Sequence, residues 1–159
     1  MIDHRIEVLK RAFLNDPLFN FLWPDERQRT RHIGTVIEFF LVASSRVITL
    51  DHSNGECAAV AGVAGPGEYP LTFFKTIALM PVLVKMMLSS LSPTPLTMMR
   101  KFVRLYSGVE RIHPRLPHWY ILIIGVDPAH QGQSFGGRLL KKVLGWADEQ
   151  GVLVYLECS

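Results

Sequence analysis

The sequence has few cysteines, no long run of like charges and no uninterrupted apolar stretch of membrane-spanning length. Its two cysteines among 159 residues follow neither a metal-binding nor a redox spacing. Seventeen Lys and Arg residues against 14 Asp and Glu residues give a formal charge of +3, without the basic run that is typical of nucleic-acid binding. The longest apolar stretch, residues 71–91, is interrupted by Lys75, Pro81 and Lys85, which a membrane span rarely tolerates. We therefore expect a cytoplasmic protein with neither a nucleic-acid nor a membrane partner.

The residues that are present predict a single globular domain over 1–159. Apolar residues make up 48% of the chain, and its length allows a sizeable core. Apolar residues at helical spacing predict a helix that ends at residues 15–17 and a second helix that begins at Pro24. Strand-like segments at 46–50 and 57–63 flank a Ser-Asn-Gly turn, which predicts a hairpin.

The C-terminal half predicts further helices and strands. Segment 71–104 has two helical pieces separated by two prolines, and its methionines and leucines belong either to the core or to a pocket wall. Residues 119–126 are nearly all apolar, as in a strand that is covered on both faces. An amphipathic helix at about 135–149 and a strand at 152–157 follow. This order of elements indicates an α/β fold.

The most informative segment is the polar loop between the apolar strand and the amphipathic helix, residues 126–137. It reads Gln-x-x-Ser-x-Gly from Gln131 to Gly136. A loop of this kind leaves backbone N–H groups without partners at a helix N-terminus, where a phosphate group can bind. The sequence has no Gly-x-x-x-x-Gly-Lys-Ser/Thr and no Gly-x-Gly-x-x-Gly motif, which argues against a nucleotide triphosphatase and a dinucleotide fold.

This loop resembles the acyl-CoA pyrophosphate loop of the GNAT superfamily of N-acetyltransferases, whose usual pattern is Arg/Gln-x-x-Gly-x-Gly/Ala. Four further segments resemble the strand–loop–helix–strand core of this family, in the pattern of its puromycin N-acetyltransferase-like members: 118–120, 124–128, 147–151 and 155–159. The resemblance implies a GNAT-like mixed sheet with flanking helices, the acyl-CoA N-acyltransferase fold.

Two departures from the family pattern stand out. Ser134 occupies a position where glycine is usual, and serine disfavours a positive φ. The family pattern continues beyond Ser159 with a helix and two strands that bring a tyrosine, often the general acid, and it starts with a strand before Met1. By this resemblance we expect a domain that is incomplete at the C-terminus and truncated at both ends. The strand at 152–157 would then expose an edge, from which we expect a homodimer.

The resemblance implies acetyl-CoA as the cosubstrate and implies no metal. In the family, the strand that ends near Val126 pairs its backbone with the pantetheine arm, which assigns cofactor binding to Ile124 and Val126. The diphosphate is assigned to the loop, whose backbone N–H groups can act as donors. The loop residues are Gln131, Gly132, Gln133, Ser134, Phe135, Gly136 and Gly137.

Acetyl transfer to an amine needs a proton acceptor, because an alkylammonium of pKa about 10.4 is almost fully protonated at pH 7. Glu157 is the first catalytic candidate, since it is expected at the end of the strand beside the cofactor strand; the alternative is a structural carboxylate. Tyr155 shares its strand face and lines either the acceptor pocket or the core. We expect His118 at the wrong end of its strand and His130 exposed. The other histidines, His113 among them, form no recognisable constellation.

We therefore expect an acetyl-CoA-dependent N-acetyltransferase, an acyltransferase that acts on a primary amine. A small-molecule acceptor is favoured because the apolar segment 71–104 suggests an enclosed pocket. The alternative is a degenerate, non-catalytic acyl-CoA-binding module that acts as a sensor or an assembly partner. Ser134 and the missing C-terminal elements favour this alternative, whereas the otherwise intact loop favours the enzyme.

Overall fold

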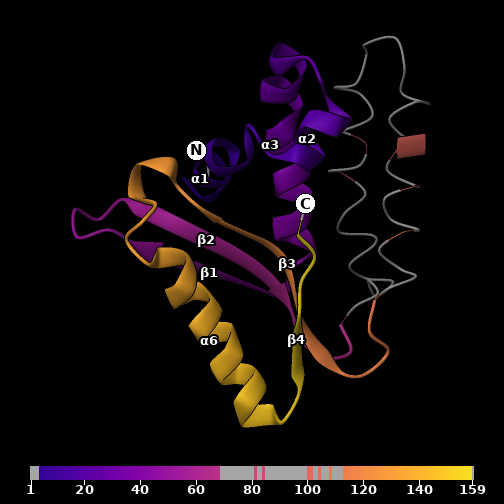
Figure 1. Ribbon diagram of the computed structural model, residues 1–159, viewed down its shortest axis with the longest axis vertical. Coiled ribbons are helices and arrows are strands. Elements are labelled where there is room, and N and C mark those ends of the chain that lie inside the picture. The colour runs from indigo at the N-terminus through magenta and orange to yellow at the C-terminus, as the bar shows by residue number, and fades with distance from the viewer. Residues whose placement is uncertain are drawn as a thin grey trace.

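The computed structural model describes residues 4–68 and 113–158, together with the isolated positions 81, 84, 100, 101, 104 and 108. Four strands form one mixed sheet in the order β1-β2-β3-β4 (Figure 1). The strands are β1 (Arg46–Asp51), β2 (Cys57–Ala64), β3 (His118–Val126) and β4 (Leu153–Tyr155). The helices are α1 (His4–Phe13), α2 (Pro17–Leu22), α3 (Glu26–Ala43) and α6 (Phe135–Gln150), and a 3-10 turn spans Pro128–His130. The predicted mixed α/β sheet with flanking helices is confirmed, whereas most of the predicted helical segment 71–104 lies outside the described residues.

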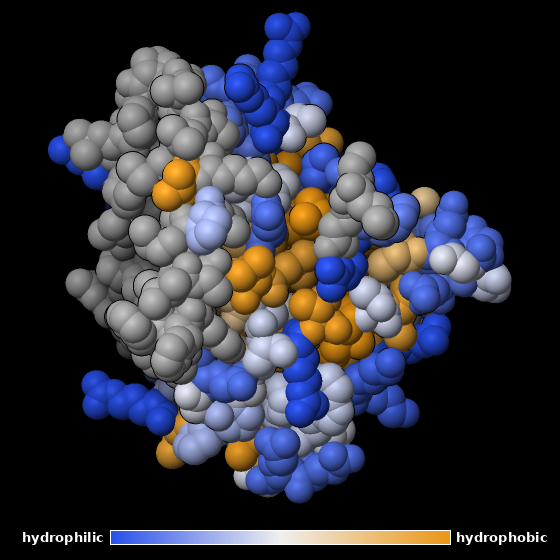
Figure 2. Space-filling view, turned by 180° about the vertical axis from the view of Figure 1, so that it is seen from behind, coloured by the Kyte–Doolittle hydropathy of each residue, from blue (hydrophilic) through white to orange (hydrophobic). Residues whose placement is uncertain are grey.

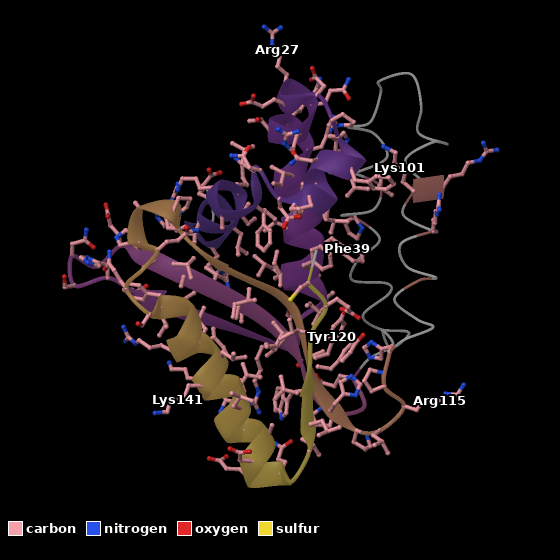
Figure 3. The ribbon with its side chains drawn as sticks, in the orientation of Figure 1. Arg27, Phe39, Lys101, Arg115, Tyr120 and Lys141 are labelled. Atoms are coloured by element: carbon pink, nitrogen blue, oxygen red, sulfur yellow. The ribbon has the colours of Figure 1, made fainter. Side chains whose placement is uncertain are left out.

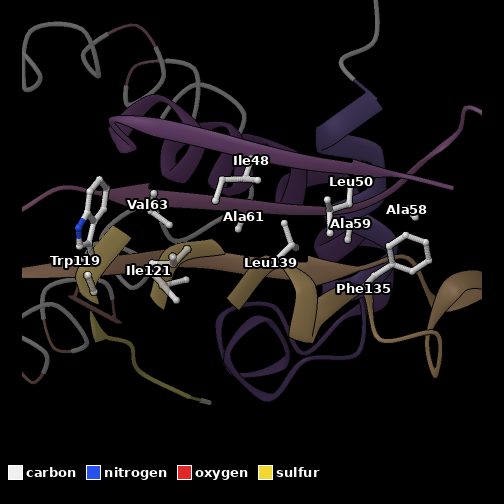
Figure 4. Close-up of a cluster of buried hydrophobic side chains, with 12 residues drawn as sticks. Ile48, Leu50, Ala58, Ala59, Ala61, Val63, Trp119, Ile121, Phe135 and Leu139 are labelled. Atoms are coloured by element: carbon white, nitrogen blue, oxygen red, sulfur yellow. The ribbon is translucent and has the colours of Figure 1, made fainter. Parts of the chain in front are cut away.

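The two faces of the sheet carry different helices. Helix α6 covers one face and contributes buried side chains such as Phe135 and Leu139 to a cluster with Trp119 and Ile121 of β3 (Figure 4). The three N-terminal helices cover the other face, where their apolar side chains pack against Val60 and the β3 strand. The sheet is therefore buried on both sides, as the apolar run in β3 predicted.

The N-terminal helices begin at well-defined caps. Asp25 accepts a hydrogen bond from the backbone N–H of Gln28 at 2.9 Å and starts α3 where the sequence predicted a helix. Asp16 accepts from the N–H of Leu18 at 2.8 Å and starts α2, which the sequence did not predict. The Asn-Asp-Pro triplet was interpreted only as the end of α1, but Asp followed by Pro is also a favourable helix start.

A buried arginine joins these helices. Arg29 of α3 is 6% exposed, and its guanidinium donates to the carbonyl of Leu14 at 2.6 Å and to that of Trp23 at 2.8 Å. Because these carbonyls belong to the segments that follow α1 and α2, one side chain holds three helices together on the same face of the sheet.

Strand β3 pairs with β2 from Tyr120 to Val126 but with β4 only at its start, from His118 to Tyr120. The β2–β3 ladder is antiparallel and has an irregularity where Gly62 pairs with Ile123 and Val63 with Ile121. The β3–β4 ladder is parallel and ends where Tyr120 pairs with Tyr155. The prediction of a strand over 152–157 was therefore too long, because the chain diverges from β3 after Tyr155 and the ladder stops. The sheet is split from this point to the end of β3.

The surface shows where polar and apolar side chains gather. On the face turned away in Figure 1, apolar side chains collect near the centre and charged ones surround them (Figure 2). Two large apolar residues of the N-terminal helices, Phe21 and Val42, are 48% and 40% exposed. Within the described ranges, no helix is long and apolar enough to cross a membrane.

Candidate functional site

A cleft of about 450 Å³ lies at the split between β3 and β4. Helix α1 borders it on one face of the sheet, and helix α6 borders it on the other. Its lining residues are Ala12, Phe13, Ile121, Ile124, Gly125, Val126, Gln131, Gly136, Gly137, Leu140 and Leu156. The cleft is therefore bounded by both layers of helices and by the strand edge between them.

The strand edge in this cleft carries the backbone groups of Ile124 and Val126. The N–H of Asp127 donates to the carbonyl of Ala58 at 2.8 Å, so at that residue the backbone faces β2. Neighbouring residues of a strand direct their N–H and C=O groups to opposite edges. Val126, and Ile124 two residues before it, therefore face the edge that β4 does not cover. Both line the cleft, and their role in binding a cofactor stays a prediction.

Gly125 allows α1 to reach this edge. A Cβ atom at Gly125 would lie 2.8 Å from Cδ2 of Leu9 and 3.1 Å from Cβ of Ala12. Real Cβ atoms essentially never show the shorter of these contacts, so a side chain here would require Leu9 or α1 to shift, whereas glycine permits the close approach of α1 to β3. This approach is what brings Phe13 to the wall of the cleft.

The loop after β3 starts at an ion pair whose carboxylate is buried. Asp127 is 5% exposed, accepts from Nε of Arg11 at 2.8 Å and accepts from the backbone N–H of Ala129 at 3.0 Å. Burial alone raises the pKa of Asp127, but the hydrogen bonds from Arg11 and Ala129, with the charges of Arg11 and His130, outweigh it and lower that pKa below 3.8. Asp127 is therefore ionised at neutral pH and anchors the loop to α1.

The loop ends at the exposed N-terminus of α6. The first backbone hydrogen bond of this helix runs from the N–H of Arg138 to the carbonyl of Ser134 at 3.0 Å. The N–H groups of Phe135, Gly136 and Gly137 precede it and have no acceptor within the helix. A second cavity of about 350 Å³ lies beside them and is lined by Val126, His130, Gln131, Gly132, Ser134, Phe135 and Gly136. Donors grouped at a helix N-terminus suit a diphosphate, so the residues present fit the expected ligand.

Ser134 adopts a left-handed conformation, with φ 61° and ψ 14°. Among the described residues it is the one non-glycine residue with a positive φ. Its side chain makes no capping hydrogen bond to α6. The position that glycine usually fills in the family thus has the backbone conformation that glycine favours, and serine adopts it at a cost of roughly 1 kcal/mol or more.

Two histidines pack beside the loop. His130 was predicted to be exposed, but it is half-buried because its ring lies 4.8 Å from that of His52, which follows β1. Its ring also meets that of Phe135 edge-on at 6.2 Å. On the outer side, the guanidinium of Arg138 lies over the Phe135 ring at 5.2 Å.

The catalytic candidates Glu157 and Tyr155 lie where the two strands separate. Oε2 of Glu157 accepts a hydrogen bond from the hydroxyl of Tyr120 at 2.6 Å. Tyr120 lies next to the C-terminal segment in Figure 3. Burial, followed by the hydrogen bond to Glu157 and its charge, raises the pKa of Tyr155 above 10.0. Both tyrosines therefore border a half-buried carboxylate, at strand positions next to the cleft residues Ile121 and Leu156.

Sequence reasoning missed His113, which joins His118 to this group. Nε2 of His113 lies 3.0 Å from Nε2 of His118, and its Nδ1 lies 3.9 Å from Oε1 of Glu157. His118 is at the start of β3, as predicted, but it is not isolated from Glu157, because the preceding loop folds His113 between them. The only sequence signal is the pair of prolines at 114 and 117, which turn this short loop back.

Metal chemistry was not predicted for this site. In the part of the chain that the structure describes, no group of three or more His, Cys, Asp or Glu side chains is arranged to hold a metal ion.

Comparisons with known proteins place this geometry in context. Residues 101–159 match the model of the Acetyltransferase (GNAT) family. The N-alpha-acetyltransferase RimI of Mycobacterium tuberculosis is 45% identical over 53 residues, which are 33% of this chain and 32% of that protein. A crystal structure described as histone acetyltransferase HPA2 and related acetyltransferase from Corynebacterium glutamicum aligns with a TM-score of 0.57 and 22% identity, over 90% of this chain and 64% of that chain.

The structural likeness shows a shared fold, in which a mixed sheet is flanked by helices. The family match covers β3, the loop, α6 and β4, which together build most of the cleft. The C-terminal part of the chain, residues 101–159, is thus similar to GNAT acetyltransferases, a family whose enzymes use acetyl-CoA as cosubstrate. The chain spans about a third of the length of the curated relative and less than two thirds of the solved one.

Proposed function

We propose that this chain belongs to an acetyl-CoA-dependent N-acetyltransferase that acetylates a primary amine of a small molecule. The observation that carries the proposal is the split between β3 and β4, whose cleft is bordered by helices of both layers and ends at the N-terminus of α6. A ligand that follows the uncovered edge of β3 would reach donors for a phosphate group at one end and a carboxylate near the other.

The cofactor would be held by backbone groups more than by side chains. Ile124 and Val126 would pair with the amide-containing arm along the strand edge, and residues 131–137 would surround the diphosphate. Each charge-assisted hydrogen bond contributes about 1.5–3 kcal/mol, and the dipole of α6 adds about 0.3–1 kcal/mol. When bound, acetyl-CoA supplies an activated acetyl thioester.

The chain's own contribution to the chemistry would be proton transfer. Glu157 would accept a proton from the ammonium group of the acceptor, because its half-buried carboxylate lies at the point where the strands part. Tyr120 fixes the orientation of this carboxylate through its hydrogen bond to Oε2. Tyr155, whose raised pKa keeps its phenol protonated at neutral pH, would be the proton donor.

Two classes of acceptor have support. The puromycin N-acetyltransferase-like sequence pattern favours a small-molecule amine. A second candidate is the α-amino group of a peptide, which is favoured by the 45% identity with a protein named N-alpha-acetyltransferase. A third reading, a non-catalytic acyl-CoA-binding module, is favoured by the strained Ser134 in the loop.

Calorimetry with acetyl-CoA, followed by CoA-thiol release, separates these readings. The acceptor panel contains small primary amines and short peptides with free N-termini. We expect binding, and turnover with at least one small amine. Binding without turnover on any acceptor would support the non-catalytic module, turnover on peptides alone would support the second candidate, and no binding would overturn all three.

We also propose that the chain forms a homodimer through β4. In the described sheet β4 is an outer strand, and its first residue, Leu153, is 58% exposed. Edge strands with exposed apolar residues favour pairing with another chain. Light scattering after size-exclusion chromatography should give the mass of a dimer, and a Leu153→Lys variant should give that of a monomer. A monomeric wild-type chain contradicts this proposal.

A further inference from the structure

We propose that His113 and His118 form a proton relay behind Glu157, in which the proton that Glu157 takes from the acceptor passes to Nδ1 of His113. This inference rests on the proposed acetyltransferase function for its catalytic meaning. The arrangement of protons that it requires does not depend on that function. His113 acts through Glu157, so it is a positioning residue and not a group that touches the acceptor.

The first step concerns the tautomer of His118. Its Nδ1 lies 2.6 Å from the carbonyl oxygen of Leu116, and a carbonyl only accepts hydrogen bonds. Nδ1 of His118 must therefore carry a proton. The side chain is 7% exposed and faces His113 with its other nitrogen, so the neutral form of His118 presents an acceptor lone pair at Nε2.

The second step sets the tautomer of His113. Its Nε2 lies 3.0 Å from Nε2 of His118, and one proton must lie between the two nitrogens. Because Nε2 of His118 is the acceptor, Nε2 of His113 is the donor. In neutral His113, Nδ1 then carries a lone pair, and this atom is the one that lies 3.9 Å from Oε1 of Glu157.

The two histidines can hold only one extra proton between them. A second one would place N–H groups on both facing nitrogens and break their contact. The nitrogen that remains open to protonation is Nδ1 of His113, on the side of the carboxylate. The relay is therefore directional, and its end point is an imidazolium–carboxylate pair between His113 and Glu157.

The surroundings of His113 fit this role. The titratable groups that face it in the described part of the chain are Tyr120 of β3, Tyr155 of β4, His118 and Glu157. The rings of Tyr120 and Tyr155 meet the His113 ring edge-on, with centroids at 4.9 Å and 5.0 Å. These contacts hold the imidazole plane in place, and the side chain of His113 is only 10% exposed.

The proton balance of the step is complete. The acceptor's ammonium N–H bond breaks, and its electron pair stays on the nitrogen, which becomes the nucleophile. The proton forms an O–H bond to Glu157 and then an N–H bond to Nδ1 of His113, so that the carboxylate is restored as an anion. No further reactant is needed, and the imidazolium later loses its proton to water.

Long-range ¹H–¹⁵N spectra of the imidazole rings test the relay without any ligand. Above the titration range, we expect His118 as the Nδ1–H tautomer and His113 as the Nε2–H tautomer. On acidification, His113 should gain the next proton at Nδ1. In a Glu157→Gln variant, its titration midpoint should fall by about one pH unit or more, because the neighbouring charge is gone. His4→Gln, at the exposed start of α1, is the matched control and should leave both rings unchanged.

Three outcomes of these spectra overturn the relay. They are an Nδ1–H tautomer of neutral His113, earlier protonation of His118, and a His113 midpoint that Glu157→Gln does not move. In a conservative His118→Asn variant, neutral His113 should become a mixture of its two tautomers. The far-ultraviolet circular dichroism spectrum of this variant should match that of the wild type, which shows that the fold is intact. If this variant unfolds, the wild-type and Glu157→Gln spectra still decide.

Turnover gives a second test, which distinguishes a relay role of His113 from a merely structural one. A His113→Gln variant should lose at least tenfold in kcat/KM with an alkylamine at pH 7, because the acceptor must first be deprotonated. With an aromatic amine, which is already a free base at pH 7, the same variant should retain the wild-type value. Equal losses with both amines overturn the relay. If the wild-type chain binds no acetyl-CoA, the proposed function fails, and the spectra alone decide the proton arrangement.

Discussion

Arg11 of α1 and Asp127 at the end of β3 form an ion pair across 116 residues of sequence, with Nε of Arg11 2.8 Å from Oδ2 of Asp127. The carboxylate is 7% exposed at its side chain, while the arginine is 53% exposed. This pair fixes the N-terminal helix to the first residue of the loop between β3 and α6. Because α1 also borders the cleft through Phe13, the ion pair couples the wall of the cleft to the loop that closes its end.

Asp127→Asn should destabilise the chain by about 1–2 kcal/mol, because the amide oxygen can still cap Ala129 but the ion pair with a half-exposed arginine is lost. Urea unfolding at pH 7 measures this difference. The depressed pKa of Asp127 stabilises the wild type at neutral pH, and this contribution is lost as pH falls through its folded pKa, below 3.8. The two proteins should therefore approach each other in stability at the acid end. As a control, Glu7→Gln removes the partly exposed pair with Lys10, three residues along the same helix, and should cost at most about 0.5 kcal/mol.

Ser134→Gly should stabilise the fold by up to about 1 kcal/mol, because glycine adopts φ 61° without strain. Part of this gain is offset by the larger conformational freedom of glycine in the unfolded chain. Thermal unfolding of the two proteins gives the difference. Ser134→Ala keeps the strain and removes only the hydroxyl, so it should not stabilise. A glycine variant less stable than wild type would show that the serine is not strained.

Much of the fold was predictable because its signals are local. Helices α3 and α6 carry apolar stripes, and Asp25 and Gly151 mark their ends as capping rules require. Helix α2 was missed because Asp16 and the proline after it can equally end one helix and begin another. The loop between β3 and α6 was predicted in its place because its polar residues and glycines are consecutive in the sequence, and its binding of a diphosphate stays a prediction.

The rest of the site depends on contacts between distant segments. The sequence of β4 shows an alternating pattern but not the residue at which the strand leaves β3, so its end at Tyr155 was not predicted. Glu157 was proposed from its strand position alone. The partners that surround it, Tyr120 and His113, come from another strand and from a loop whose path no periodicity describes.

Gly136→Val should abolish acetyl-CoA binding and leave the fold intact. A Cβ atom at this position meets only Cγ2 of Val126, at 3.4 Å, so the backbone tolerates it, but the side chain would enter both cavities that the residue lines. Gly145→Val is the matched control, because it lies in the same helix with no atom within 4 Å of its Cβ position. Calorimetry should show wild-type affinity for the control and none for Gly136→Val. Equal affinities would remove the assignment of the diphosphate to this loop.

His32 should make the stability of the chain depend on pH below 6.5. Its ring is 4% exposed and stacks on Trp23 at 5.6 Å, and burial, followed by the charge of Arg31, lowers its pKa from 6.5. Because the unfolded chain binds the proton more readily, stability is fully present above pH 6.5 and declines as pH falls toward the folded pKa. His32→Phe keeps the stacking and removes the titration. Urea unfolding between pH 7.5 and 5 should therefore show that the variant gains stability relative to the wild type as pH falls. If the stabilities of the two proteins instead change in parallel with pH, His32 is protonated equally in the folded and unfolded states.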